Sequence, residues 1–232
     1  MSDPVPYIDF HNHAIWHQPD VIEVVSIHGA QQKNKKYYTI GYHPWWTDQP
    51  LTADQIKLIE DAYSNDPYCL GIGEFGLDKL KGASLEIQTT VMEQQLEIAS
   101  KFHAPIVLHC VRAFERAFEL RRKYNHFPWV NHGFVRNKVL ARQVLDAGMY
   151  LSLAPHHRMT PVFEEMLKYV PLDSVFIETD SAYDVNIQDR YRIFAELRQQ
   201  PVDYIKETVF NNFKKFYSDK WKYHNGSNAQ HY

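Results

Sequence analysis

The sequence predicts an α/β fold, a TIM-type (β/α)8 barrel, from three observations. Eight short apolar runs, rich in Val, Ile, Tyr and Phe, have the length of single strands. From the third run onward, the intervals contain segments with apolar residues every three or four positions, as in amphipathic helices. Strands alternating with helices favour a parallel sheet, and 232 residues fall within the roughly 200 to 400 of the barrel architecture.

The expected elements follow the chain in order. The strands are expected at residues 7–10, 23–27, 37–41, 69–72, 105–108, 129–131, 149–153 and 175–177. The helices between them are expected at residues 53–63, 85–102, 112–124, 138–147 and 162–169, and two more, at 190–199 and 202–216, close the ring. Because no shift in composition marks a second domain, we expect one domain over residues 1–232, with a polar tail from about residue 218.

The first third of the chain departs from this pattern. Only about eight residues separate the first expected strand from the second, and the second from the third, whereas a parallel crossover usually needs a dozen or more. We therefore expect a barrel that is distorted here, with truncated helices and a second strand, 23–27, that runs antiparallel between its neighbours. His28, at the end of that strand, is then expected on the opposite face from the functional site and to be structural.

Composition restricts the function classes. A net charge of −3 and a pI near 6.5 give no broad basic field for gripping nucleic acid, so an anionic substrate would have to be attracted locally, for example by a bound metal ion. No run approaches the roughly 18 apolar residues of a membrane span, and no leader is recognisable, so we expect a cytoplasmic protein without a membrane partner. Cys69 and Cys110 lie in apolar runs, which suits reduced core thiols.

Residues of the types that bind metals follow the expected strands. His11 and His13 are two residues apart, so on an extended strand they point to the same side. Strand ends of a barrel face one common site, and the further candidates at these ends are His43, Glu74, His109, His132 and Asp180. Four histidines and two carboxylates, without His43, exceed the three or four protein ligands of one catalytic ion. The sequence therefore predicts a two-metal site, with Glu74 as the bridging carboxylate.

Several motifs together resemble the TatD family of metal-dependent hydrolases, nearly end to end. They are DFHNH, TIGYHPWW, GIGEFGLD, the segment QTTVMEQQLEIASKFHAPIVLHC, NHGF, ETD and NNFKKFY. The resemblance implies a barrel with two divalent ions, zinc, manganese or magnesium, that hydrolyses phosphodiester bonds, with exonuclease-like degradation of DNA. It also implies that one ion is held by His11, His13, Glu74 and Asp180, and the other by Glu74, His109 and His132. Asp180 is expected to be the general base for the attacking water, with Glu74 as the second catalytic residue.

Departures from the family pattern fall in segments that would touch substrate, such as Cys110-Val111-Arg112 after the fifth strand. Arg112, expected to begin a helix, is predicted to grip a phosphate, with a surface ion pair as the alternative. Trp45 is predicted to stack on a base, with packing over the barrel rim as the alternative. His43 is predicted to contact substrate or support the metal ligands, with a plain structural turn as the alternative. Short first loops favour an open site, suited to single-stranded DNA or strand ends.

These residues are compatible with three functions. The first is a metal-dependent deoxyribonuclease with a nucleic acid substrate, and the expected arginines at the site favour it. The second is a deacylase or amidohydrolase on an ester or amide, since the same barrel and ions serve acyl chemistry. The third is a non-enzymatic, metal-stabilised interaction module, which a free base at Asp180 argues against. The sequence leaves open the metal, the polarity of digestion and the oligomeric state, with a monomer favoured.

Overall fold

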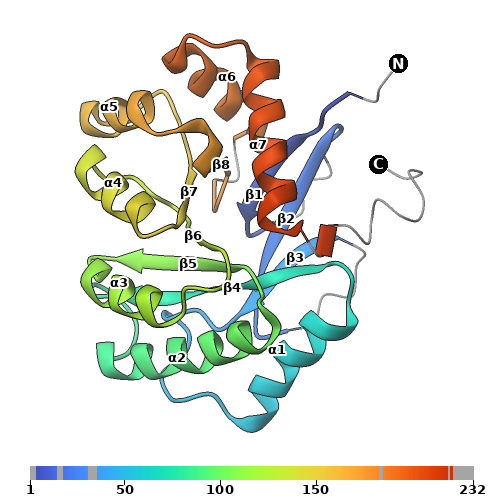
Figure 1. The fold of residues 1–232 in the computed structure, drawn as a ribbon, viewed down its shortest axis with the longest axis vertical. Coiled ribbons are helices and arrows are strands. Elements are labelled where there is room, and N and C mark those ends of the chain that lie inside the picture. The colour runs from blue at the N-terminus through green and yellow to red at the C-terminus, as the bar shows by residue number, and fades with distance from the viewer. Residues whose placement is uncertain (1–3, 15–17, 31–35, 183–184, 219, 222–232) are drawn as a thin grey trace. The chain divides into compact units, whose positions relative to one another are not determined.

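A computed structural model describes residues 4–14, 18–30, 36–182, 185–218 and 220–221. The strands are β1 (Tyr7–Asn12), β2 (Val21–His28), β3 (Tyr37–Gly41), β4 (Cys69–Asp78), β5 (Ile106–Val111), β6 (Trp129–Asn131), β7 (Tyr150–Leu153) and β8 (Val175–Ile177). The helices are α1 (Ala53–Asn65), α2 (Leu85–Phe102), α3 (Phe114–Lys123), α4 (Lys138–Asp146), α5 (Pro161–Tyr169), the short 3-10 turn η1 (Leu172–Ser174), α6 (Ile187–Arg198) and α7 (Val202–Phe216). All eight predicted strands are present, and from β3 onward helices separate them (Figure 1).

The sheet follows the order of the chain, from β1 to β8. The pairs β1/β2, β3/β4, β4/β5, β5/β6 and β7/β8 are all parallel. The last strand also meets the first, because Asn12 and Asp180 form a parallel bridge beyond the ends of β1 and β8. The predicted (β/α)8 class is confirmed.

The chain forms two compact units. Unit 1 contains both ends of the chain, Met1–Val25 and Gly133–Tyr232, and unit 2 is the continuous segment Ser26–His132. Unit 1 therefore carries β7, β8, β1 and most of β2, while unit 2 carries β3 to β6. The single domain expected over residues 1–232 stays a prediction.

The second strand is parallel to the first, so the antiparallel arrangement that we predicted is wrong. Tyr7 pairs with Val21 and Ile8 with Ile22, and Asp20, with φ +59°, turns the chain back into the strand. A six-residue strand is about 20 Å long, and eight extended residues span up to roughly 28 Å. The connection can therefore return to the start of β1 without a helix, which the usual crossover length assumes.

Helices α1, α2 and α3 of unit 2 pack against its strands β4 and β5 (Figure 1). Helix α1 begins with a capping box, because Thr52 accepts from the Gln55 backbone while the Gln55 side chain accepts from the Thr52 backbone. Helix α2 ties two site-bearing segments to the helix layer. Its buried Gln95 binds both the backbone N–H and the carbonyl of Tyr42, and its buried Gln88 binds both the backbone N–H and the carbonyl of Asp78, the last residue of β4.

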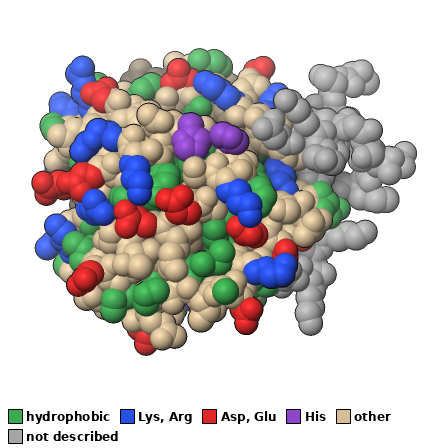
Figure 2. Space-filling view, turned by 60° about the horizontal axis from the view of Figure 1, so that its bottom comes forward, with side chains coloured by type: hydrophobic (Ala, Val, Ile, Leu, Met, Phe, Trp, Pro, Cys, Tyr) green, Lys and Arg blue, Asp and Glu red, His purple; other side chains and the backbone are tan. Residues whose placement is uncertain are grey.

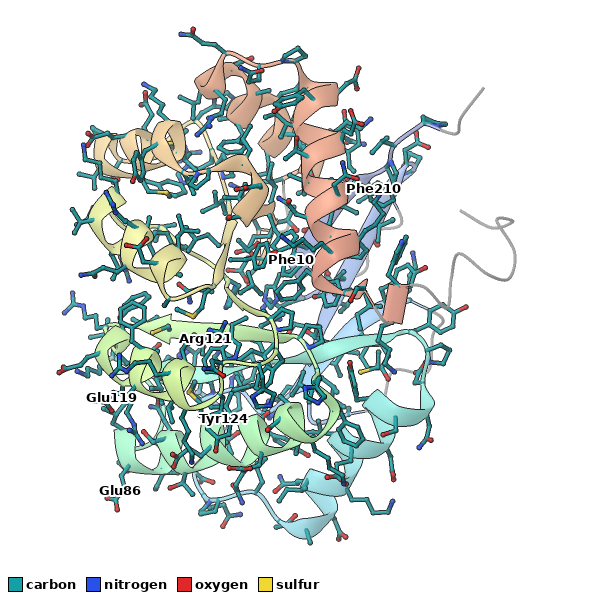
Figure 3. All side chains as sticks on the ribbon, viewed as in Figure 1. Phe10, Glu86, Glu119, Arg121, Tyr124 and Phe210 are labelled. Atoms are coloured by element: carbon teal, nitrogen blue, oxygen red, sulfur yellow. The ribbon has the colours of Figure 1, made fainter. Side chains whose placement is uncertain are left out.

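The core of unit 1 is an aromatic cluster beneath α7 (Figure 3). Phe10 of β1 stacks on Phe176 of β8, with ring centroids 3.9 Å apart, and Phe216 packs against both rings. Within the predicted polar tail, Trp221 is buried against Phe213. Most of that tail lies outside the described residues. No helix in the described ranges is long and apolar enough to cross a membrane.

Candidate metal centre

Three histidine side chains of unit 2 meet around one carboxylate oxygen of Glu74. Oε1 of Glu74 lies 3.0 Å from His43 Nε2, 2.9 Å from His109 Nδ1 and 2.5 Å from His132 Nε2. All four side chains are buried. Glu74, His109 and His132 are the predicted ligands of one ion, so unit 2 brings this predicted set together.

Strand β4 extends beyond the prediction and places Glu74 within the strand rather than at its end. The register between β4 and β5 shifts between Gly73 and Phe75, and the strand continues to Asp78. Gly76 makes this pairing possible, since a Cβ there would lie 1.9 Å from the carbonyl oxygen of His109. The two strands thus approach closely at the point where they present Glu74 and His109.

His43 contacts the carboxylate directly, and its own hydrogen bonds fix its tautomer. Its Nδ1 accepts from the backbone N–H of Trp45 at 3.1 Å, so the ring proton must sit on Nε2, which then donates to Glu74. Burial lowers the pKa of His43, and the hydrogen bond to Glu74 opposes this shift. In this tautomer His43 supports the carboxylate, and its Nε2 has no lone pair to offer a metal.

His28 lies at the same end of the sheet as His43, contrary to our prediction. Its Nδ1 accepts from the backbone N–H of His43 at 3.1 Å. The expected placement on the opposite face followed from the antiparallel second strand, and it fails together with that strand. Burial lowers the pKa of His28, and the nearby His43 lowers it further.

Asp78 is a residue of this cluster that the sequence analysis missed. Its Oδ2 lies 3.2 Å from His109 Nε2 and accepts from Trp45 Nε1 at 2.7 Å, while Oδ1 accepts from the backbone of Leu80. Burial raises the pKa of Asp78, but the hydrogen bonds from Trp45, Leu80 and His109 outweigh it, so the pKa is lowered. The signal was available, because Asp78 is four residues beyond Glu74 and an even spacing keeps both on one face of a strand.

Unit 1 brings together the other three predicted ligands, His11, His13 and Asp180. One donor atom from each lies within 4.8 Å of the others. His13 Nε2 is 3.2 Å from Asp180 Oδ1, and the two histidine rings are perpendicular, with centroids 5.0 Å apart. The backbone N–H of Asp180 donates to the carbonyl of His11 at 2.9 Å, which joins the end of β1 to the segment after β8.

Asp9 of β1 holds the segment after β8 in place through Thr179, a role that was not predicted from the sequence. Its Oδ1 accepts from the backbone N–H of Thr179, and its Oδ2 accepts from the Thr179 hydroxyl at 2.6 Å and from Asn12 Nδ2 at 3.2 Å. Burial raises the pKa of Asp9 to about 7, although these hydrogen bonds act in the opposite direction. Asp9 is two residues before His11, so it lies on the same side of the strand.

The donor sets of both clusters suit a divalent cation. Imidazole nitrogen and carboxylate oxygen are the ligands that zinc and manganese prefer. In unit 2, three ring nitrogens face Glu74 Oε1 within 3.0 Å, yet one carboxylate oxygen offers only about two lone pairs. Since His43 Nε2 donates its proton to this oxygen, His109 Nδ1 and His132 Nε2 are the nitrogens that could bind a cation beside Glu74.

Of the two predicted substrate residues Arg112 and Trp45, one lies in an exposed bend and the other lies beside the histidine cluster. Arg112 is exposed and has φ +55°, in a bend before α3, so the expectation that it begins the helix is wrong. Trp45 lies beside the unit 2 cluster, with its ring 5.0 Å from that of His43 and 5.5 Å from that of His109.

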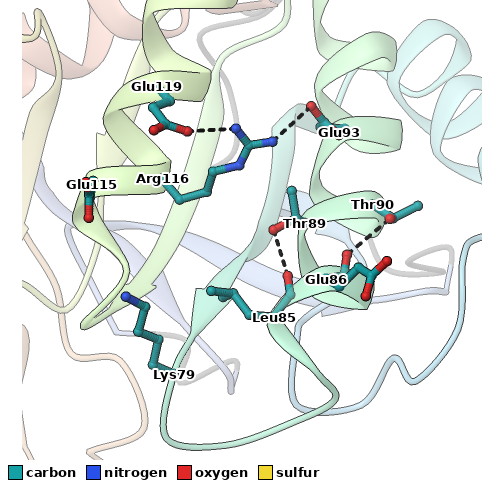
Figure 4. Close-up of a pocket in the computed structure, with 9 residues that line it drawn as sticks. All are labelled: Lys79, Leu85, Glu86, Thr89, Thr90, Glu93, Glu115, Arg116 and Glu119. Atoms are coloured by element: carbon teal, nitrogen blue, oxygen red, sulfur yellow. Dashed lines mark hydrogen bonds and ion pairs between the residues drawn. The ribbon is translucent and has the colours of Figure 1, made fainter.

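Among the described residues on the face drawn in Figure 2, no broad anion-binding patch is visible. On the face in Figure 2, lysine and arginine side chains alternate with aspartate and glutamate. A groove of about 520 Å³ between α2 and α3 (Figure 4) has four glutamates and two cationic residues in its lining, and its Arg116 is held by Glu119 and Glu93. Its lining consists of Lys79, Leu85, Glu86, Thr89, Thr90, Glu93, Glu115, Arg116 and Glu119. This groove does not suit a phosphate backbone.

Comparisons with known proteins agree with this fold. The family model described as TatD related DNase matches residues 21–218. The exonuclease of Salmonella typhimurium described as 3'-5' ssDNA/RNA exonuclease TatD is 29% identical over 176 residues, which cover 68% of this chain and 65% of that protein. The uncharacterized metal-dependent hydrolase YjjV of Escherichia coli is 25% identical over 203 residues, 79% of this chain and 77% of its own.

A solved structure shows the same fold. The crystal structure of YjjV, a TatD homologue from Escherichia coli, superposes with a TM-score of 0.74 at 20% identity, over 91% of this chain and 98% of that one. The clusters of histidine and carboxylate in this (β/α)8 fold are donor sets of the kind that bind metal ions in metal-dependent hydrolases. The chain belongs to the TatD-related DNase family.

Proposed function

We propose that this protein is a metal-dependent nuclease that removes nucleotides from the ends of single-stranded DNA. The observation that carries the proposal is the convergence of His109 Nδ1 and His132 Nε2 on Glu74 Oε1 within a buried cluster, a donor set that suits a cation. Membership of the TatD-related DNase family and similarity to a 3'-5' ssDNA/RNA exonuclease support nucleic acid as the substrate.

The ligands of two divalent ions are proposed from the two clusters. Glu74, His109 and His132 would hold one ion in unit 2, and His11, His13 and Asp180 would hold the other in unit 1. The bridging role predicted for Glu74 joins residues of different units and stays a prediction. Zinc, manganese and magnesium are the candidate ions, and the histidine-rich donor sets favour the first two.

Such ions, when bound, lower the pKa of a water molecule and neutralise charge on the phosphate. The side chains around them have distinct tasks. Asp180 is 38% exposed and lies 3.2 Å from His13, so we assign its carboxylate the proton of the attacking water. His43 orients Glu74 by donating from Nε2. Arg112, exposed beside β5, is the proposed phosphate contact.

The test is degradation of single-stranded DNA labelled at either end, with Mg²⁺, Mn²⁺ or Zn²⁺ and with EDTA. Asp180→Asn is compared with Asp203→Asn, a control carboxylate on α7 whose side chain is 95% exposed. We expect metal-dependent shortening that the first variant loses by at least about 100-fold, as typical for an acid–base group, and that the control retains. The ladder from each end gives the polarity.

No shortening with any of the metals would refute the proposal. Ester and amide substrates would then be assayed with the same variants, because the same ions also serve acyl transfer. Shortening that persists in Asp180→Asn would leave a nuclease but remove Asp180 as its base.

A further inference from the structure

We propose that Trp45 and Lys81 form a subsite for one nucleobase and its neighbouring phosphate, in which the base replaces the Lys81 ammonium group on the Trp45 ring. The inference rests on the proposed nuclease function and specifies how that site grips its substrate. It concerns residues of unit 2 alone.

The Trp45 ring is exposed yet fixed in place. Trp45 is 37% exposed, but its ring Nε1 donates to the buried Asp78 at 2.7 Å. Asp78 is itself held by the backbone N–H of Leu80 at 2.7 Å. A large aromatic side chain that is rigid before binding loses little entropy when a ligand stacks on it.

The ring also lies next to the residues of the metal centre. Its centroid is 5.0 Å from that of His43 and 5.5 Å from that of His109, and both pairs are nearly perpendicular. Asp78 connects the two directly, because the same Oδ2 atom that accepts from Trp45 lies 3.2 Å from His109 Nε2. A base on this ring would therefore place its phosphate beside the groups that surround Glu74.

The segment after β4 brings a cation to the ring. Lys81 Nζ lies 3.6 Å from the Trp45 ring centroid. The neighbouring Gly82, with φ +93°, approaches the backbone so closely that a Cβ there would be 2.2 Å from the Pro44 carbonyl oxygen. A larger residue at position 82 would push the segment away, so the contact between Lys81 and Trp45 depends on this glycine.

The main chain of this segment is held, so the lysine side chain can move alone. Gln88 Nε2 donates to the carbonyls of Asp78, Lys81 and Ala83 at 2.8–3.1 Å. The Lys81 side chain is exposed. An arriving base can take the ring face by stacking, and the displaced ammonium group then meets the phosphate that flanks the base.

The test measures binding without cleavage. Fluorescence anisotropy in EDTA compares a labelled single strand with ordinary terminal nucleotides and the same strand with abasic tetrahydrofuran residues at both ends. We expect the wild-type protein to bind the first strand several-fold more tightly. Trp45→Leu should remove this ratio and Trp45→Phe should keep part of it. Trp46→Leu is the matched control, since Trp46 is the next residue and is more exposed, and it should retain the ratio.

Lys81→Met tests the phosphate contact separately. It should weaken binding of the ordinary strand more than that of the abasic strand, because only a base moves the ammonium group from the ring to the phosphate. For the ordinary strand alone, the dependence of binding on salt should fall by about one phosphate contact. Equal binding of the two strands by the wild-type protein, or a ratio unchanged in Trp45→Leu, would overturn the subsite. Failure of the proposed function would give a different result. The protein would still bind the ordinary strand more tightly than the abasic one, but it would shorten single-stranded DNA with none of the metals.

Discussion

Replacement of Gly76 by alanine should disrupt the strand pair that presents Glu74 and His109. The added Cβ would lie 1.9 Å from the backbone carbonyl oxygen of His109, so β4 and β5 must separate by more than about 1 Å to reach ordinary contact. Overpacking of this kind costs about 1–3 kcal/mol. The backbone at Gly76, with φ +155°, is unfavourable for alanine and adds about 1–3 kcal/mol. Together we expect a loss of about 4 kcal/mol in the free energy of unfolding.

The matched control is Gly133→Ala. Gly133 also has positive φ, +59°, but the nearest atom to its added Cβ is Glu178 Oε1 at 4.0 Å, so only the backbone term of about 1–2 kcal/mol applies. Urea unfolding of both variants, followed by circular dichroism in EDTA, gives the two losses. If Gly76→Ala costs no more than Gly133→Ala, the close approach of β4 and β5 does not exist as described.

Two further predictions concern unit 1. Asp9 has its pKa raised from 3.8 to about 7 in the folded state, so its stabilising contribution is complete below pH 4 and is lost as the pH rises to about 7, a change of about 4 kcal/mol. The variant Asp9→Asn has no carboxyl group that titrates at this position. Urea unfolding in EDTA from pH 4 to pH 8 should therefore show the wild-type protein losing stability relative to the variant as the pH rises. A difference in stability that stays constant over this range would contradict the prediction. Phe10→Ala removes a fully buried ring that stacks on Phe176 and should cost about 3–5 kcal/mol in thermal or urea unfolding, whereas a loss below about 1 kcal/mol would mean that this aromatic core is not packed as described.

The sequence predicted the strands well because most of them are buried runs between clear helix patterns. Strands β3, β6 and β8 have the predicted bounds. The direction of β2 was predicted wrongly because the usual length of a parallel crossover includes a helix. An extended connection needs fewer residues to reach the start of the next parallel strand. The extent of β4 was also missed, since the glycines at 73 and 76 weaken a strand pattern although here they permit the close approach of β5.

The gathering of histidines and carboxylates within each unit could be predicted from the sequence, because strand ends of a barrel converge. Their supporting residues could not be recognised from spacing alone. Asp78 and Asp9 share a strand with a predicted ligand, but which of them reaches a partner depends on distant residues, Trp45 for the first and Thr179 for the second. The bend at Arg112 was missed because a positive φ at an arginine has no sequence signal.

The order in which the chain is made bears on when the parts of this centre can form. Asp9 of β1 binds Thr179, which follows it by 170 positions. At about 5–20 residues per second on the ribosome, roughly 10 to 30 s pass between their syntheses. Unit 2 is complete at His132, before that partner exists. On a nascent chain, all residues of the Glu74 cluster are therefore synthesised before the hydrogen bond between His11 and Asp180 can form. Until β8 is synthesised, the edge of β1 that pairs with it remains open.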